Sequence, residues 1–224
     1  MKRIGILLVA GLIFGLCGAS RSNAGSLIVN GSFEDQNVGT GWASFSSITG
    51  WNTNGNGIEI DYDTAFGPGS TAYSGTQSLE LNYTQPEDVY QTVTGLVVGQ
   101  SYDLSWAYGD RPGSGDEEMQ VTWGGNVVAT DYDLLNGSNP TVLWNLNSVV
   151  VTATSTSEVL SFNGIDVAGV NNNGGPSYGN EVDAVSLVST PEPSTLMLLG
   201  TGLALLAMGW AFVAQRKTLP ADIA

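Results

Sequence analysis

Residues 101–108 have the sequence Ser-Tyr-Asp-Leu-Ser-Trp-Ala-Tyr, in which small or polar side chains alternate with large ones. Successive side chains of an extended strand point to opposite faces, so the large ones share a face: Tyr102, Leu104, Trp106 and Tyr108. A strand with one apolar and one polar face is typical of an antiparallel sheet that covers a core and meets water on its other side. This octapeptide therefore predicts a half-buried strand.

Five further segments have the same character. They are short runs rich in Val, Thr, Tyr and Trp, separated by Gly, Pro, Asn and Ser, and they span residues 89–93, 119–123, 148–153, 158–162 and 181–188. No segment of this region has a clear helical period. About 165 residues with turn signals at such short intervals predict one all-β domain, residues 25–189, built as a β-sandwich.

The composition of this domain excludes several function classes. Residues 25–190 contain 19 Asp and Glu residues, one basic residue, Arg111, and neither His nor Cys. Ser-His-Asp and thiol catalysis, thiolate or imidazole zinc sites and disulfides are therefore excluded. A net charge of 1 − 19 = −18 repels nucleic acid. A glycosidase needs only two carboxyl groups, but no pair is singled out, so we predict a protein that is not an enzyme.

The N-terminal residues 1–24 have the pattern of a secretory signal peptide. Lys2 and Arg3 precede an apolar stretch, residues 4–17, that is too short to span a bilayer comfortably. Small residues at Ser22 and Ala24 predict cleavage after Ala24. Cys17 follows Leu16, where a lipoprotein signal needs a small residue, so the sequence does not favour lipid attachment.

The C-terminal region predicts a transmembrane helix. Residues 196–214 are 19 residues without a charge, and as a helix they would extend about 28 Å, enough to cross the hydrocarbon layer. Arg216 and Lys217 follow and would remain in the cytoplasm, which leaves the domain outside it. We therefore expect an exported protein that this helix holds in the membrane.

The tripeptide Pro191-Glu192-Pro193, the apolar span and the basic pair together resemble the PEP-CTERM sorting signal, here residues 190–217. The resemblance implies export and processing by an exosortase, at the surface of a bacterium that makes exopolysaccharide and a biofilm matrix. The chain departs from the family pattern because its basic cluster has two charges and a short tail, residues 218–224, follows. The alternative is a plain membrane anchor.

A second resemblance covers residues 26–189. The segments Leu-Ile-Val-Asn-Gly-Ser-Phe-Glu (27–34), Val-Tyr-Gln-Thr-Val (89–93) and Asn-Glu-Val-Asp-Ala-Val-Ser-Leu (180–187) resemble the galactose-binding-like jelly roll of choice-of-anchor domains and carbohydrate-binding modules. The resemblance implies a jelly-roll β-sandwich in which Glu34 and Asp183 lie close together around a structural Ca²⁺. Alternatively, Glu34 caps a turn and Asp183 bonds neighbouring backbone without a metal.

A sugar site needs exposed aromatic rings beside polar groups. Trp51 and Trp123 lie next to Gly- and Asn-containing stretches and Tyr108 adjoins the loop of Arg111, so these four residues are the candidate ligand contacts. The alternatives are burial in the core for the aromatic side chains and an ion pair with Asp110 or Asp116 for Arg111.

Two functions remain compatible with these features. The first is recognition of extracellular polysaccharide by the jelly-roll domain. The second is a structural or adhesion protein of the envelope or biofilm matrix, with a protein partner and no sugar site.

Overall fold

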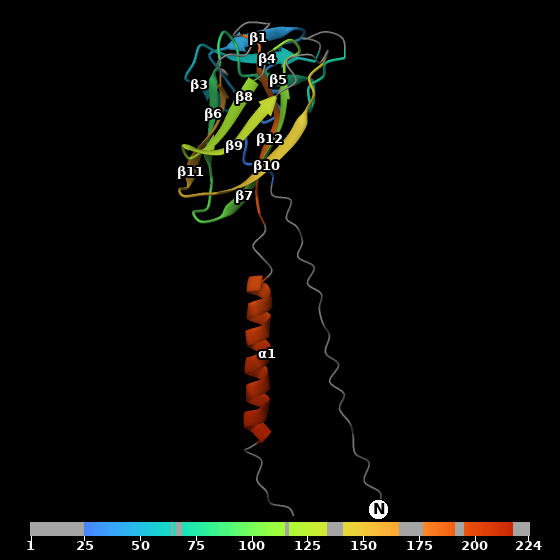
Figure 1. Cartoon of the computed structure of the whole chain (residues 1–224). Helices are drawn as coiled ribbons and strands as arrows, with labels where there is room; N and C mark the ends of the chain where they lie inside the picture. The colour runs from blue at the N-terminus through green and yellow to red at the C-terminus, as the bar shows by residue number, and fades with distance from the viewer. Residues whose placement is uncertain are drawn as a thin grey trace, which may run out of the picture.

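Two antiparallel β-sheets face each other in this protein (Figure 1). The computed structural model describes residues 25–63, 65, 69–114, 117–133, 141–165, 177–190 and 195–216. The first sheet, sheet A, has the strand order β1 (Trp42–Phe45), β4 (Ile58–Tyr62), β5 (Gln77–Glu80), β12 (Asn180–Ser189), β7 (Ser101–Asp110) and β10 (Asn145–Thr152). The second, sheet B, has the order β2 (Ser47–Ile48), β3 (Trp51–Thr53), β6 (Asp88–Thr94), β11 (Ser157–Ile165), β8 (Glu117–Trp123) and β9 (Asn126–Asp133).

The six predicted strands correspond to β6, β7, β8, β10, β11 and β12. In β7 the alternation predicted from the sequence is confirmed, because Tyr102, Leu104, Trp106 and Tyr108 are all buried. The all-β prediction and the two-sheet arrangement of a β-sandwich are likewise confirmed.

A chain of aromatic side chains links the two sheets across the core. Trp51 of β3 lies 5.5 Å from Phe33 and 6.0 Å from Phe162, measured between ring centroids. Phe162, on β11 of sheet B, lies 6.2 Å from Trp106, on β7 of sheet A, in an edge-to-face contact. Because each large ring removes much apolar surface from water, these four residues contribute a major part of the core energy.

The N-terminal segment of the domain lies along the last strand. The Leu27 N–H donates to the Leu187 carbonyl at 2.9 Å, and the Val185 N–H donates to the Gly31 carbonyl at 2.8 Å. A Cβ atom at Gly31 would lie 2.0 Å from the Val185 carbonyl oxygen, so only glycine allows this close approach. The contact brings the start and the end of the domain together.

Helix α1 (Thr195–Arg216) contains the span 196–214 that the sequence predicts to be helical. Among the described residues, no helix meets both the length and the apolarity needed to cross a membrane. The predicted signal peptide, residues 1–24, lies outside the described residues, as do Pro191, Glu192, Pro193 and residues 217–224.

Candidate functional site

Carboxylates gather on the outer face of sheet A, the face directed away from the core. In β4 the side chains of Ile58 and Ile60 enter the core, so Glu59 and Asp61 point the other way. The same alternation places three more carboxylates on this face, from neighbouring strands β5 and β12: Glu80, Glu181 and Asp183.

Around these carboxylates the outer face is covered rather than open to water. A Cβ atom at Gly109 of β7 would lie 2.5 Å from the Val142 side chain, so the segment that contains Val142 lies directly on the sheet. Trp144 donates its indole N–H to the Thr71 carbonyl at 2.8 Å, which joins this segment to a second covering segment. The carboxylates beneath are therefore buried.

Four of these carboxylates form what we call the acidic cluster: Glu59, Asp61, Glu80 and Glu181, each at most 3% exposed. Carboxylate oxygens of Glu59, Asp61 and Glu80 lie within 4.8 Å of one another. The Ser78 hydroxyl donates to Glu181 Oε2 at 2.9 Å, and the Gly179 N–H donates to Glu80 Oε1 at 3.1 Å.

Arg111 supplies positive charge to the acidic cluster. Its Nη1 lies 2.7 Å from Glu80 Oε2 and 3.9 Å from Glu59 Oε1, and its guanidinium lies 4.0 Å above the Tyr178 ring centroid. The sequence suggested Asp110 or Asp116 as the ion-pair partner, whereas the structure pairs Arg111 with carboxylates of β4 and β5. Asp116 lies outside the described residues.

Burial raises the pKa values of the carboxyl groups in the acidic cluster. It raises the pKa of Glu59 to about 8, an effect that the charge of Asp61 increases and that of Arg111 opposes. Burial also raises the pKa of Asp61 to about 6, although Arg111 lowers it. Glu80 and Glu181 have pKa values well above the ordinary value because burial and neighbouring carboxylates disfavour their ionised forms. These raised pKa values favour the protonated, uncharged forms of the cluster, which reduces the negative charge beside its one guanidinium.

Glu34 and Asp183, the predicted calcium ligands, both bind the turn at residues 74–77. Glu34 accepts the N–H groups of Thr76 at 2.7 Å and Gln77 at 2.8 Å, and Asp183 accepts the Ser74 N–H at 2.7 Å. These are the bonds of the turn-capping alternative. An ionised carboxylate has about four acceptor positions, so both side chains also fit the oxygen ligation that Ca²⁺ requires.

Asp183 is fully buried and lies beside a strained stretch of backbone. Burial raises its pKa to about 7, whereas bonds from the Ser74 and Ala184 N–H groups lower it and the charge of Glu34 raises it. Ala184 has φ 50°, a left-handed conformation that is costly for alanine, and the β12 register shifts between Asp183 and Ser186. This bulge accompanies the 2.5 Å bond from the Ala184 N–H to Asp183 Oδ1.

A polar cleft of about 380 Å³ opens beside this turn. It is lined by Glu34, Asn37, Gly39, Tyr62, Thr76 and Gln77. Trp42 of β1 lies close along the chain to two lining residues, because Gly39 precedes it by three positions and the Gly41 carbonyl accepts the Tyr62 N–H at 2.8 Å. Trp42 pairs with Asp61 in the β1–β4 register, so its side chain lies on the outer face, where it is 54% exposed.

The exposure that we expected of three aromatic residues is not observed. Trp51 is fully buried and donates its indole N–H to the Asn30 carbonyl, and Tyr108 is 3% exposed and donates to Asn180 Oδ1 at 2.8 Å. Trp123 is 5% exposed and donates to the Thr152 carbonyl at 3.2 Å. Strand alternation directs all three rings into the core, and adjacent Gly or Asn residues do not alter it.

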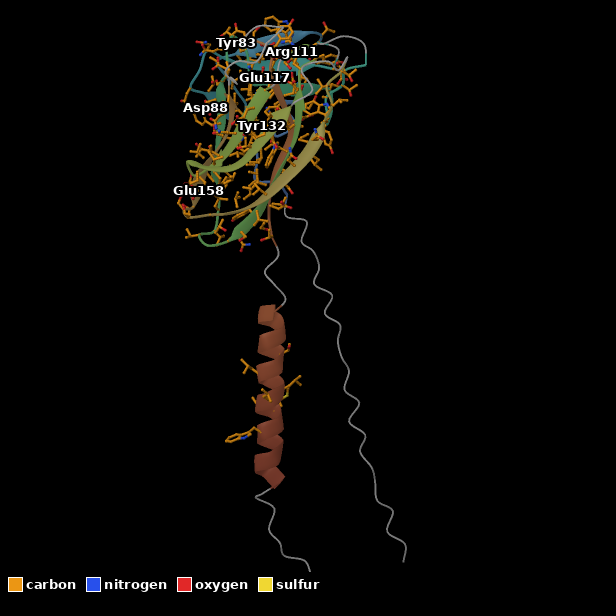
Figure 2. The ribbon with its side chains drawn as sticks, in the orientation of Figure 1. Tyr83, Asp88, Arg111, Glu117, Tyr132 and Glu158 are labelled. Carbon is orange, nitrogen blue, oxygen red and sulfur yellow. The ribbon has the colours of Figure 1, made fainter. Side chains whose placement is uncertain are left out.

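Trp123 borders a second cleft, of about 230 Å³, together with Glu158. Figure 2 shows Arg111 and Glu158 toward opposite ends of the sandwich. The structure therefore does not bring the four predicted ligand contacts into one site.

The sequence interpretation missed Trp42 and the acidic cluster. The available signal was the alternation of apolar and acidic side chains in residues 58–61 and 181–183. In each segment a strand buries one face in the core, and only the covering segments, which sequence patterns do not place, bury the other.

The fold and the C-terminal segment define a class: a β-sandwich protein that carries a C-terminal sorting signal. Residues 189–217 match the PEP-CTERM protein-sorting motif, which implies export and membrane-associated sorting. The chain is 28% identical over 196 residues to halomucin of Haloquadratum walsbyi, an alignment that covers 84% of this chain and 2% of halomucin. It is 27% identical over 148 residues to the multifunctional-autoprocessing repeats-in-toxin of Vibrio vulnificus, covering 65% of this chain and 2% of the toxin. The chain thus spans about 2% of the length of these curated relatives.

A solved cyclase structure shares the fold. The Stig cyclase Fisc of Fischerella sp. TAU is similar with a TM-score of 0.52 and 16% identity, over 76% of this chain and 99% of the cyclase. A family 35 carbohydrate-binding module of Clostridium thermocellum is also similar, with a TM-score of 0.39 and 15% identity, over 66% of this chain and 92% of the module.

Proposed function

We propose that this chain is an exported, non-enzymatic surface protein that binds extracellular polysaccharide at the cleft beside Trp42. The observation that carries the proposal is an exposed indole on β1, close along the chain to Gly39 and Tyr62 of a polar cleft. Sugars present C–H faces that stack on aromatic rings and hydroxyl groups that bond to carboxylates and amides. Trp42 supplies the ring, and Glu34 and Asn37 supply the polar groups.

The size of the cleft supports a small part of a polysaccharide as the ligand. Its volume of about 380 Å³ lies at the lower end of the range of small-molecule sites, roughly 300–1,000 Å³.

The absence of enzymatic activity is part of the proposal. Residues 25–190 contain no His and no Cys, and the carboxylates with the most strongly raised pKa values are covered by chain and at most 3% exposed. A catalytic acid must contact its substrate, which the cover over these groups prevents.

The sorting motif supports the location that we propose. Exosortase would process the chain near the Pro-Glu-Pro motif, and the C-terminal segment would keep it associated with the membrane until then. The domain would remain outside the cytoplasm, attached to the membrane or released to the cell surface or matrix, where polysaccharide is available as a partner.

Calcium at Glu34 and Asp183 belongs to the same proposal. Both carboxylates bind the turn at residues 74–77, and Thr76 and Gln77 of this turn line the cleft. A structural Ca²⁺ here would hold one wall of the sugar site in place.

A glycan-array screen of the full chain in mild detergent tests the proposed function. We expect binding that Trp42→Ala abolishes and that Tyr132→Ala leaves intact, because Tyr132 is also exposed but belongs to β9 of sheet B. No binding to neutral or acidic glycans would overturn the proposal. It would favour instead a structural or adhesion protein with a protein partner.

A further inference from the structure

The acidic cluster carries an uncompensated charge. Four carboxylates lie together beneath the covering segments. Residues 25–190 contain one basic side chain, Arg111, which contacts Glu80 and Glu59. Removing an ionised carboxylate from water costs several kcal/mol unless a counter-charge or hydrogen-bond donors replace the lost water. With all four groups ionised, the cluster and Arg111 together have a net charge of 1 − 4 = −3.

Particular oxygen atoms in this cluster have no hydrogen-bond donor. In the part of the chain that the structure describes, no donor reaches Asp61 Oδ1, Asp61 Oδ2 or Glu181 Oε1. Asp61 is 1% exposed and Glu181 is fully buried, and the Asp61 carboxyl lies against those of Glu80 and Glu181. Buried polar atoms are almost always paired, so these three oxygens require either a shared proton or a positive partner.

The spacing of the oxygens is compatible with a divalent cation. Oxygens of Glu59, Asp61 and Glu80 lie within 4.8 Å of one another. Ca²⁺ binds oxygen at about 2.3–2.6 Å, so ligands on opposite sides of the ion are about 4.6–5.2 Å apart. Mg²⁺ usually keeps several of its waters, and a cluster with residues at most 3% exposed does not favour them.

We propose that the acidic cluster binds a calcium ion, at a site separate from Glu34 and Asp183. Glu59, Asp61 and Glu80 are the ligands, with Glu181 Oε1 facing the same ion. Arg111 is a positioning residue, which fixes Glu80 through Oε2. The ion reduces the net charge from −3 to −1, and it joins β4, β5 and β12 beneath their cover. The site does not depend on sugar binding.

The alternative to a bound calcium ion is that the carboxyl groups of the acidic cluster share protons. If the carboxyl groups bond to one another through protons, the cluster needs no metal and gains nothing from calcium. Asp61→Asn distinguishes the two cases, because the amide supplies N–H donors to Glu80 and Glu181 but removes the charged ligand. The variant should therefore fold, and be at least as stable as the wild type without calcium.

The experiment is a calcium titration of the full chain in mild detergent, by calorimetry and by thermal unfolding, after chelator treatment. We expect calcium to raise the Tm of the wild type, and Asp61→Asn to bind one equivalent fewer and to show a smaller rise. The site's Kd should lie in the range of extracellular calcium modules or below, at most about 1 mM.

Asp183→Asn is the matched control, since it alters the other candidate site. Asp183→Asn should still bind one equivalent of calcium. This result tests the inference even if Asp61→Asn does not fold. The inference is overturned if Asp183→Asn binds no calcium, if Asp61→Asn keeps the wild-type stoichiometry, or if magnesium gives an equal rise in Tm.

Discussion

Arg111 balances part of the negative charge of the carboxylates that are buried on the outer face of sheet A. Its Nη1 lies 2.7 Å from Glu80 Oε2, and the side chain of Glu80 is fully buried. The guanidinium also packs against the Tyr178 ring and donates to the Ser177 carbonyl at 3.4 Å. A planar group with several donors suits this position better than a lysine, because it contacts a carboxylate, a carbonyl and a ring together.

Arg111→Met should therefore destabilise the protein at neutral pH. The methionine fills similar space but leaves Glu80 buried without its counter-charge, a loss that typically costs about 3–5 kcal/mol. Urea unfolding followed by circular dichroism at pH 7 measures the change. Arg111→Lys is the control and should lose less, and an unchanged unfolding midpoint for Arg111→Met would refute the role of this ion pair.

Two tryptophans show how one residue type has opposite roles. Trp51 is fully buried between Phe33 and Phe162, whereas Trp42 is 54% exposed. We expect Trp51→Ala to reduce the free energy of unfolding by about 3–5 kcal/mol, because it leaves a large cavity. Trp42→Ala should change it by no more than about 0.5 kcal/mol. Chemical denaturation of both variants checks this, and equal losses would contradict the assignment of Trp51 to the core.

Among the elements, those with strong alternation could be predicted from the sequence and the short ones could not. The strands β6, β7, β8, β10, β11 and β12 each contain a β-rich run that the pattern detects. The strands β1, β2, β3 and β5 have two to four residues each, too few for a period to be measured, and pairing with neighbours defines them. Two longer strands, β4 and β9, were also missed.

The candidate site, too, could be predicted from the sequence only in part. The proximity of Glu34 and Asp183 came from a family resemblance, and the structure shows both on one turn. The acidic cluster needs the lateral order β4-β5-β12 together with a cover contributed by distant segments. Local periodicity contains neither, so Glu59 and Asp61 looked like ordinary surface carboxylates.

The turn at residues 74–77 offers a test of one short element. Gly75 has φ 76°, and a Cβ atom there would lie 2.4 Å from Glu34 Oε1. Gly95 has nearly the same backbone, φ 79°, with nothing within 4 Å of the added atom. Both Gly→Ala changes carry the left-handed strain of about 1–2 kcal/mol, but Gly75→Ala must also displace Glu34 from its bonds to Thr76 and Gln77.

We therefore expect Gly75→Ala to cost about 1 kcal/mol more than Gly95→Ala. Thermal unfolding of the two variants side by side measures the difference, which cancels the shared strain. Equal losses would show that the bonds from Glu34 to the turn contribute nothing to stability.

At the scale of the whole molecule, the domain is strongly acidic, and its stability depends on the protonation of buried carboxyl groups. Residues 25–190 have a net charge of −18, and self-repulsion at the surface increases as carboxyl groups ionise. The covered face adds a second contribution, because its carboxyl groups titrate far above their ordinary range. Both contributions favour the folded state at lower pH, but added salt screens only the surface contribution effectively.

The sign of the pH dependence follows from three buried groups. The pKa values of Glu59, Asp61 and Asp183 are raised to about 8, 6 and 7, from ordinary values of 4.5, 3.8 and 3.8. Between the unfolded and folded pKa values the folded state binds more protons, so stability falls as pH rises. Their contribution is fully present below about pH 4 and is lost progressively up to about pH 8.

We therefore expect the calcium-free chain to be less stable at pH 8 than at pH 5, by several kcal/mol. Urea unfolding in the presence of chelator and high salt measures this loss with surface repulsion screened. Asp61→Asn should show a shallower decline, because the amide does not ionise and no longer raises the pKa of Glu59. Stability that rises from pH 5 to pH 8 would mean that the covered carboxylates are ionised and already balanced by charge in the folded chain.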